Sequence, residues 1–179
     1  MPDLIVRAVN RRSTRGIACL GGLIMPCGLG RTGRTIIKRE GDGASPVGRW
    51  PIAGFYARSD RRNGFHRTRI ADSAHVLTPQ SGWCDEPADR NYNRPVSHPY
   101  PASAERLWRS DHLYDVIVVL DCNFLRRVRG RGSAIFLHLA GDAPDGGIAP
   151  TAGCVSLRQR DLVIFLSHMT PSTAVRICP

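Results

Sequence analysis

The sequence predicts a mainly β protein, built as a sheet sandwich or partial barrel with one or two short helices. The chain contains 18 Gly and 13 Pro, which favours many turns between short strands. Two apolar runs, at 114–120 and 133–138, have the continuous pattern of strands that are buried on both faces. Only 159–169 shows clear helical periodicity. At 179 residues, one domain is expected over 1–179.

The N-terminal half is expected to alternate strands with turns. Its strands or hairpins are predicted at 4–9, 16–29, 34–38, 50–57 and 74–77. Between the third and fourth of these, the segment 39–48 has turn composition throughout and is predicted as a loop.

The C-terminal half begins with a polar, Pro-rich insertion at about 79–103, which we expect to act as a stiff lid. After it, 104–110 is predicted as a short helix. The remaining elements are predicted as strands at 114–120 and 133–138, a helix at 159–169 and a final strand at 174–178.

The chain is strongly basic. It has 25 Lys and Arg against 15 Asp and Glu, giving a net charge of +10. The basic residues are scattered, and they form no basic helix or RNA-binding motif with interleaved aromatics, so no nucleic-acid partner is expected. No apolar run reaches the roughly 18 residues that a membrane-spanning helix needs, so no integral membrane segment is expected.

An apolar stretch near the N-terminus has some features of an export signal. Arg11 and Arg12 precede the apolar residues 17–25, as a charged region precedes the hydrophobic part of a signal peptide. No small-x-small cleavage site follows, and Pro26 stands before Cys27 where lipoprotein processing needs a small residue. We therefore predict strands here, with an unusual export signal as the alternative.

The six cysteines are spread over the whole chain. No CxxC pair is present, so neither a structural zinc site nor another metal or cofactor is expected. Cys19 and Cys27 are the first candidates for a disulfide, because they would close a small loop. Most of the others are expected to be small buried hydrophobic residues.

One cysteine stands in a chemically suggestive position. His138 ends a predicted buried strand, and Gly153 and Cys154 begin another after a Gly- and Pro-rich loop. An imidazole beside a thiol can take its proton and generate a nucleophilic thiolate, with a pKa below about 8.5. Consecutive amides at Gly153 and Cys154 would donate to the oxyanion of a tetrahedral intermediate. A single Cys and a single His also occur together by chance, in which case Cys154 is structural.

Two segments resemble the signature of the L,D-transpeptidases of the YkuD family. The first is His138 followed by Thr151-Ala152-Gly153-Cys154, which is similar to the family's His, a loop, then Ser/Thr-x-Gly-Cys. The second is Lys38 followed by Ser45-Pro46-Val47-Gly48, which is similar to the family's Lys and Thr/Ser-Pro-x-Gly element. The resemblance covers about 15–178 and implies the family's β-rich fold.

The sequence departs from the family pattern at three places. Ala152 stands where typical members have a second His, and Ser156 where they have Arg or Asn. The insertion at 79–103 is similar to a divergent branch, some of whose members join the first residue of one stem peptide to the third of another. That branch is the subclass the resemblance suggests.

The resemblance implies acyl transfer on peptidoglycan stem peptides. Cys154 would form a thioester with the donor stem, His138 would move the proton, and a diaminopimelate amine of a second stem would resolve the thioester. Water as acceptor would make the enzyme an L,D-carboxypeptidase or endopeptidase instead. A non-enzymatic basic binding module is the remaining alternative.

Candidate substrate-binding residues follow from the motifs, the insertion and the charge. They are Lys38, Trp83, Tyr92, Arg94, Thr151, Ser156 and Arg158. Trp83 and Tyr92 would stack on the substrate or anchor the insertion, and Lys38, Arg94 and Arg158 would make the cleft basic. Asp85 is expected to be a solvated turn carboxylate, with a role in the cleft as the alternative. The protein is expected to be a monomer in the periplasm or cell envelope, or alternatively in the cytoplasm.

Overall fold

The computed structural model describes residues 3–61, 65, 68 and 71–179. Within them the chain is mainly β, as predicted, with one α-helix, α1 (Gln159–His168), and a short 3-10 turn, η2 (Ala71–Ser73). The N-terminal strands are β1 (Leu4–Arg7), β2 (Arg15–Leu20), β3 (Leu23–Gly28), β4 (Arg34–Thr35), β5 (Ser45–Pro46), β6 (Gly48–Ala57) and β7 (His75–Val76). The others are β8 (Ser81–Cys84), β9 (Pro95–Ser97), β10 (Ala104–Arg106), β11 (Val116–Leu120), β12 (Phe136–Leu139), β13 (Val155–Leu157) and β14 (Ala174–Ile177).

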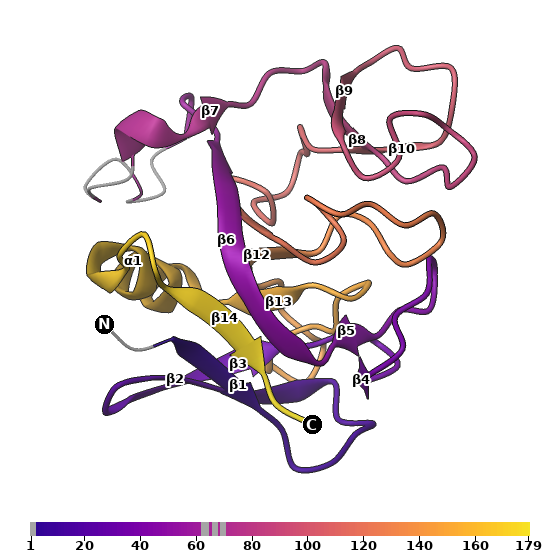
Figure 1. Cartoon of the computed structure of the whole chain (residues 1–179). Coiled ribbons are helices and arrows are strands. Elements are labelled where there is room, and N and C mark those ends of the chain that lie inside the picture. The colour runs from indigo at the N-terminus through magenta and orange to yellow at the C-terminus, as the bar shows by residue number, and fades with distance from the viewer. Residues whose placement is uncertain (1–2, 62–64, 66–67, 69–70) are drawn as a thin grey trace.

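The largest sheet formed by the described residues closes on itself. Its nine strands have the order β11-β12-β13-β3-β2-β1-β14-β6-β7, and β11 also pairs with β6. The long strand β6 therefore connects the two ends of the curved sheet (Figure 1). Strands β12 and β13 are parallel neighbours within this closed sheet, and their register places His138 opposite Ser156.

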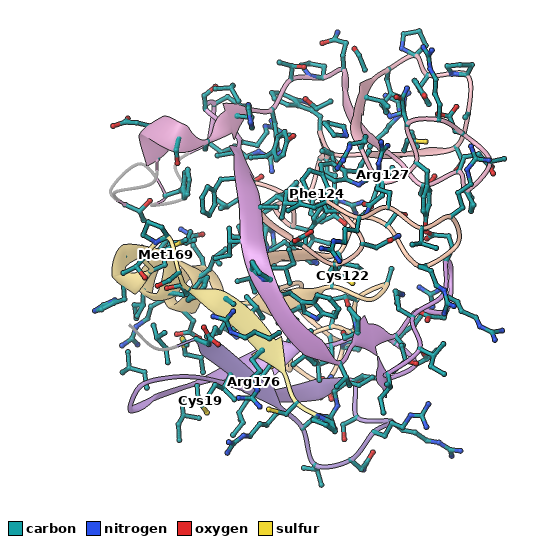
Figure 2. All side chains as sticks on the ribbon, viewed as in Figure 1. Cys19, Cys122, Phe124, Arg127, Met169 and Arg176 are labelled. Carbon is teal, nitrogen blue, oxygen red and sulfur yellow. The ribbon has the colours of Figure 1, made fainter. Side chains whose placement is uncertain are left out.

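Two apolar clusters lie on opposite faces of the central strands. The first includes Leu137 of β12, Val155 of β13 and Phe165 of α1, with Met169 packed against it. The side chain of Met169 lies beside α1 in Figure 2. The second cluster contains Phe136 together with residues of the insertion and of β11. Because successive residues of a strand point to opposite faces, the continuous apolar runs fill both clusters.

The insertion forms a small sheet of its own. Strand β8 lies between β10 and β9, and this sheet stands apart from the closed sheet at the upper right of Figure 1. The predicted helix at 104–110 is wrong, because 104–106 is strand β10 and Glu105 pairs with Trp83 of β8. Pairing with an existing strand outweighs the weak helical preference of this short segment.

Several other predictions are confirmed with changed bounds. The apolar stretch 17–25 lies in the hairpin of β2 and β3, as expected.

The predicted disulfide between Cys19 and Cys27 is wrong. Both thiols are free, and Cys27 pairs with Gly16, three positions from Cys19. That spacing is roughly 10 Å along a strand, beyond the reach of a disulfide. None of the described helices is both long enough and apolar enough to cross a membrane.

Candidate active site

The strand register places Cys154 and His138 on the same face of the sheet. Leu137 and Val155 are paired and point into the first cluster. Phe136 and Cys154, one residue earlier on each strand, point into the second cluster. His138 follows Phe136 by two positions, so it shares the face of Cys154. The Cα atoms of such a diagonal pair are about 8 Å apart, which brings the two side chains near each other.

His138 is held in one tautomer. Its Nδ1 lies 2.8 Å from the carbonyl oxygen of Leu139 and donates to it, so in the neutral ring Nε2 is the nitrogen without a proton. The ring of Tyr114 packs against the imidazole edge to face, with centroids 5.1 Å apart. Burial lowers the pKa of His138 to about 4, so the resting imidazole is neutral. A neutral ring that carries its proton on Nδ1 can accept a second proton at Nε2.

Cys154 is a protonated thiol in this arrangement. Its side chain is 5% exposed, its thiol donates to the Ala134 carbonyl at 3.2 Å, and Sγ accepts the Phe136 N–H at 3.4 Å. Burial raises the pKa of Cys154 to about 12, and the charge of Glu105 acts in the same direction. The expected pKa below about 8.5 is therefore wrong for the thiol in this structure.

A network of hydroxyl groups shapes the turn that carries the nucleophile. Thr151 Oγ1 accepts the Gly153 N–H at 3.1 Å and donates to the Cys154 carbonyl at 2.7 Å. Ser45 Oγ donates to the same carbonyl at 3.1 Å. The Gly153 N–H is thus already bonded, which leaves the Cys154 N–H as the candidate oxyanion donor. Ser45 connects the Ser-Pro-x-Gly element directly to the backbone of Cys154, a contact that the motif alone does not predict.

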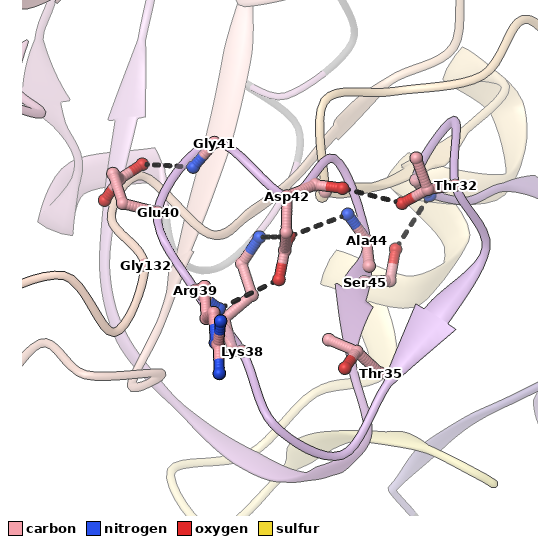
Figure 3. Close-up of polar contacts among 12 residues, drawn as sticks. Thr32, Thr35, Lys38, Arg39, Glu40, Gly41, Asp42, Ala44, Ser45 and Gly132 are labelled. Carbon is pink, nitrogen blue, oxygen red and sulfur yellow. Dashed lines mark hydrogen bonds and ion pairs between the residues drawn. The ribbon is translucent and has the colours of Figure 1, made fainter.

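The loop before β5 places the positive charge of Lys38 beside the turn that contains Gly153 and Cys154. The carboxylate of Asp42 forms an ion pair with Lys38 and accepts the backbone N–H groups of Arg39 and Ala44 (Figure 3). The Lys38 side chain is 9% exposed, and Nζ would lie 3.2 Å from a β-carbon added to Gly153. Lys38 therefore lies beside the nucleophile turn, where its charge favours the thiolate.

Two cavities meet at Cys154. One, of about 340 Å³, is lined by Lys38 and Asp85 among others, and the second, of about 200 Å³, by His138. Four residues line both: Glu105, Tyr114, Ala152 and Cys154. A group seated in either cavity can therefore approach the same sulfur atom.

The predicted substrate-binding residues separate into two groups. Lys38 lines the larger cavity, and Thr151 and Ser156 line the smaller one. Arg158 is ion-paired with Asp142, and Arg94 stacks on Phe124 and donates to its carbonyl. Neither arginine is among the residues that line the two cavities.

The two aromatic candidates of the insertion are buried. Trp83 donates from Nε1 to Asn93 Oδ1 at 2.8 Å and packs edge to face on Phe136. Tyr92 donates from its hydroxyl to Glu40, a residue that lines the larger cavity. These contacts fit the anchoring alternative, because they tie the small sheet to the rest of the chain.

The insertion reaches the candidate site through acidic residues. Asp85 of the insertion, and Glu105 just after it, both line the larger cavity beside Cys154. Asp85 is not the solvated turn carboxylate that was expected, because its Oδ1 is shielded from solvent and has no hydrogen-bond partner among the described residues. The wall of the cleft near Cys154 is therefore acidic where the insertion contributes to it.

Several residues of the site were missed by sequence reasoning. Tyr114 lies in an apolar run, and Glu105 was assigned to a helix, so neither carried a local signal. Arg31 and Arg109, which line the larger and smaller cavities, belong to a scattered set of basic residues. Only Ser45 could have been found from the sequence, through its motif.

A model of the L,D-transpeptidase catalytic domain (YkuD) matches residues 20–177 of the chain. This range contains Cys154, which lines both cavities, and His138, which lines the smaller one, together with the loop of Lys38 and Ser45. No curated protein and no solved structure matches the chain significantly. Among the described residues, no three His, Cys, Asp or Glu side chains are grouped so that they could hold a metal ion.

Proposed function

The chain belongs to the L,D-transpeptidase catalytic domain family (YkuD), which acts on peptidoglycan, and we propose that it is a cysteine-dependent L,D-transpeptidase. The observation that carries this proposal is the shared position of Cys154 and His138 on one sheet face, where both line a cavity. Peptidoglycan stem peptides are the proposed substrates, and the cell envelope is the proposed location because the cross-linked wall lies there.

In the first half-reaction Cys154 attacks a donor carbonyl. His138 Nε2 takes the thiol proton as the C–S bond forms, and the Cys154 N–H and Lys38 stabilise the oxyanion. The C–N bond of the donor then breaks, and His138 returns the proton to the leaving amine. A thioester between Cys154 and the donor stem remains.

In the second half-reaction an acceptor resolves the thioester. An amine of a second stem attacks the carbonyl carbon, the C–S bond breaks, and the sulfur regains a proton through His138. Because two cavities meet at Cys154, we infer that donor and acceptor occupy different ones. Water in place of the amine gives carboxypeptidase activity. A cross-link from the first residue of one stem to the third of another is the form suggested by the insertion.

Mass spectrometry of purified muropeptides after incubation with the protein tests this proposal. Cross-linked dimers are expected with the wild type, whereas trimmed monomers would identify the hydrolase and an unchanged mixture would support a binding module. Cys154→Ala and His138→Ala should each abolish turnover, and their effects should not add, because the two residues act as one unit. Turnover by Cys154→Ala with normal thermal unfolding would reject the thiol mechanism.

A further inference from the structure

Glu105 occupies a position that the reaction described above leaves unexplained. It is the only carboxylate among the described residues that lines both cavities at Cys154. It comes from β10 of the small sheet, and its carboxylate accepts a hydrogen bond from the Tyr114 hydroxyl at 2.6 Å. The Tyr114 ring in turn packs against His138, so Glu105 is connected through Tyr114 to the face that carries His138 and Cys154.

The surroundings of Glu105 concentrate negative charge. Asp85 and Glu40 line the same cavity, and both act to raise the pKa of Glu105, after desolvation, which is the larger cause. Three of the described basic residues line the two cavities, and two of them are ion-paired, Lys38 with Asp42 and Arg109 with Asp111, while Arg31 is the third. Asp85 Oδ1, shielded and without a partner, adds an unfilled acceptor to this wall.

Such a wall is unfavourable for the first half-reaction. A carboxylate beside a thiol disfavours the thiolate, and Glu105 does raise the pKa of Cys154. A cation that enters the cavity would neutralise the carboxylates, fill the empty acceptor of Asp85 and remove this opposition. The acceptor of a transpeptidase supplies such a group, because a primary amine is protonated at neutral pH.

We propose that Glu105 binds the protonated primary amine of the acceptor stem and takes one proton from it before attack on the thioester. This inference rests on the proposed function and assigns acceptor selection to one residue. The ammonium loses a proton to the Glu105 carboxylate, and the free amine forms the new C–N bond. The second proton leaves the nitrogen through His138 and returns to Cys154 sulfur as the C–S bond breaks. Glu105 then releases its proton to solvent.

The same geometry explains selection against water. A neutral water or hydroxyl acceptor leaves the negative charges of Glu105 and Asp85 uncompensated in a partly desolvated cavity, whereas an ammonium satisfies both. Glu105 is thus expected to set the ratio of cross-linking to hydrolysis. The acylation step needs no ammonium acceptor and should depend on Glu105 only through the thiol.

The decisive variant is Glu105→Gln, which keeps an acceptor for the Tyr114 hydroxyl but removes the charge. With purified muropeptides, its acyl-enzyme should form at least as fast as that of the wild type, while the dimer-to-hydrolysed product ratio falls at least tenfold. Glu86→Gln is the matched control, because Glu86 belongs to the insertion but lines neither cavity. An unchanged product ratio in Glu105→Gln, or an equal loss of acylation and cross-linking, would overturn the proposal.

A binding measurement separates this inference from the proposed function. In the Cys154→Ala background, a disaccharide-tripeptide with a free side-chain amine should bind at least tenfold more tightly than its N-acetylated form. Adding Glu105→Gln should remove that difference. Equal binding of the two peptides by Cys154→Ala would overturn the role of Glu105. If the peptides are discriminated but the wild type forms no acyl-enzyme, the amine site stands and the transpeptidase assignment fails.

Discussion

Gly153 has a backbone conformation that other residues rarely adopt. Its φ is 140°, and an added β-carbon would lie 3.1 Å from the Ala44 carbonyl oxygen and 3.2 Å from Lys38 Nζ. Gly153→Ala should therefore strain the turn, by about 1–3 kcal/mol, and displace Lys38 from the nucleophile. Lower kcat and a lower melting temperature are expected together.

The matched control for this substitution is Gly22→Ala. Gly22 lies in the turn between β2 and β3, its φ is outside the positive range, and an added β-carbon meets nothing within 4 Å. This variant should keep wild-type activity and stability. A wild-type kcat in Gly153→Ala would contradict this prediction, because it would show that the turn accommodates a β-carbon without displacing Lys38.

The protonation state of Cys154 predicts an unusual labelling pattern. Because burial raises its pKa to about 12, few resting molecules carry a thiolate at pH 7. A small alkylating reagent should modify the partly exposed Cys19 and Cys178 before Cys154, as followed by peptide mass spectrometry. Rapid labelling of Cys154 that is lost in His138→Ala would instead reveal a thiolate–imidazolium pair at rest.

At the scale of elements, the side chain of Ser45 connects β5 to the backbone of Cys154, immediately before β13. Ser45 Oγ accepts the Gly30 N–H at 2.9 Å and donates to the Cys154 carbonyl. Ser45→Ala removes the acceptor of the Gly30 N–H and one of the two hydroxyl donors to the Cys154 carbonyl, leaving Thr151 as the other, which should destabilise the fold by about 1–3 kcal/mol and lower kcat about tenfold.

The control for Ser45→Ala is Ser167→Ala on α1. The Ser167 hydroxyl is exposed and donates only to the Val163 carbonyl of the same helix. Its removal should change stability by less than about 0.5 kcal/mol, measured by denaturant unfolding. Similar losses in both variants would mean that the bond to Cys154 has no special role.

The sequence could predict the strands whose pattern is local. Continuous apolar runs predicted β11 and β12, but the second run begins with Ser133 and Ala134, which are not in the strand. Ala134 has a φ of 50°, so the chain turns there and its carbonyl points to the Cys154 thiol. A run of apolar residues in the sequence does not predict such a turn, because the turn is accompanied by a contact with Cys154, 20 residues away.

The residues of the candidate site that belong to a sequence motif could be predicted. His138, Cys154 and Lys38 were found because residue types at a fixed spacing resemble a family signature. Glu105 was not found, and a place for Asp85 in the cleft was only the alternative expectation, because the small sheet that carries both residues to the cavity has no local sequence signal. The expectation of a basic cleft failed for the same reason: net charge does not tell which residues line a cavity.

At the scale of the whole molecule, the proposed catalytic residues and the packing of α1 lie on different faces of the same strands. The first cluster packs α1 against the closed sheet, while the second joins the small sheet to the face that carries Cys154. A buried imidazole and buried thiols in these regions make the folded state sensitive to pH, because protons bind differently once the chain unfolds.

The pH dependence of stability has two limbs of opposite sign, and burial of a titratable group causes both. Burial lowers the pKa of His138 from 6.5 to about 4, so its stabilising effect is present above pH 6.5 and is lost as the pH falls toward 4. The loss amounts to about 3 kcal/mol at most. Burial raises the pKa of Cys27, Cys122 and Cys154 from 9.0 to about 12, so their contribution is present below pH 9 and is lost above it.

Denaturant unfolding should therefore give the highest free energy of unfolding between about pH 6.5 and 9. His138→Gln should flatten the slope between pH 6.5 and 4, because it removes the group that gains a proton on unfolding, and should leave the alkaline limb unchanged. Cys122→Ala should reduce the alkaline slope and leave the acid limb unchanged. A wild-type stability that stays constant from pH 4 to 7 would mean that solvent reaches His138, and with it the catalytic face, in the resting protein.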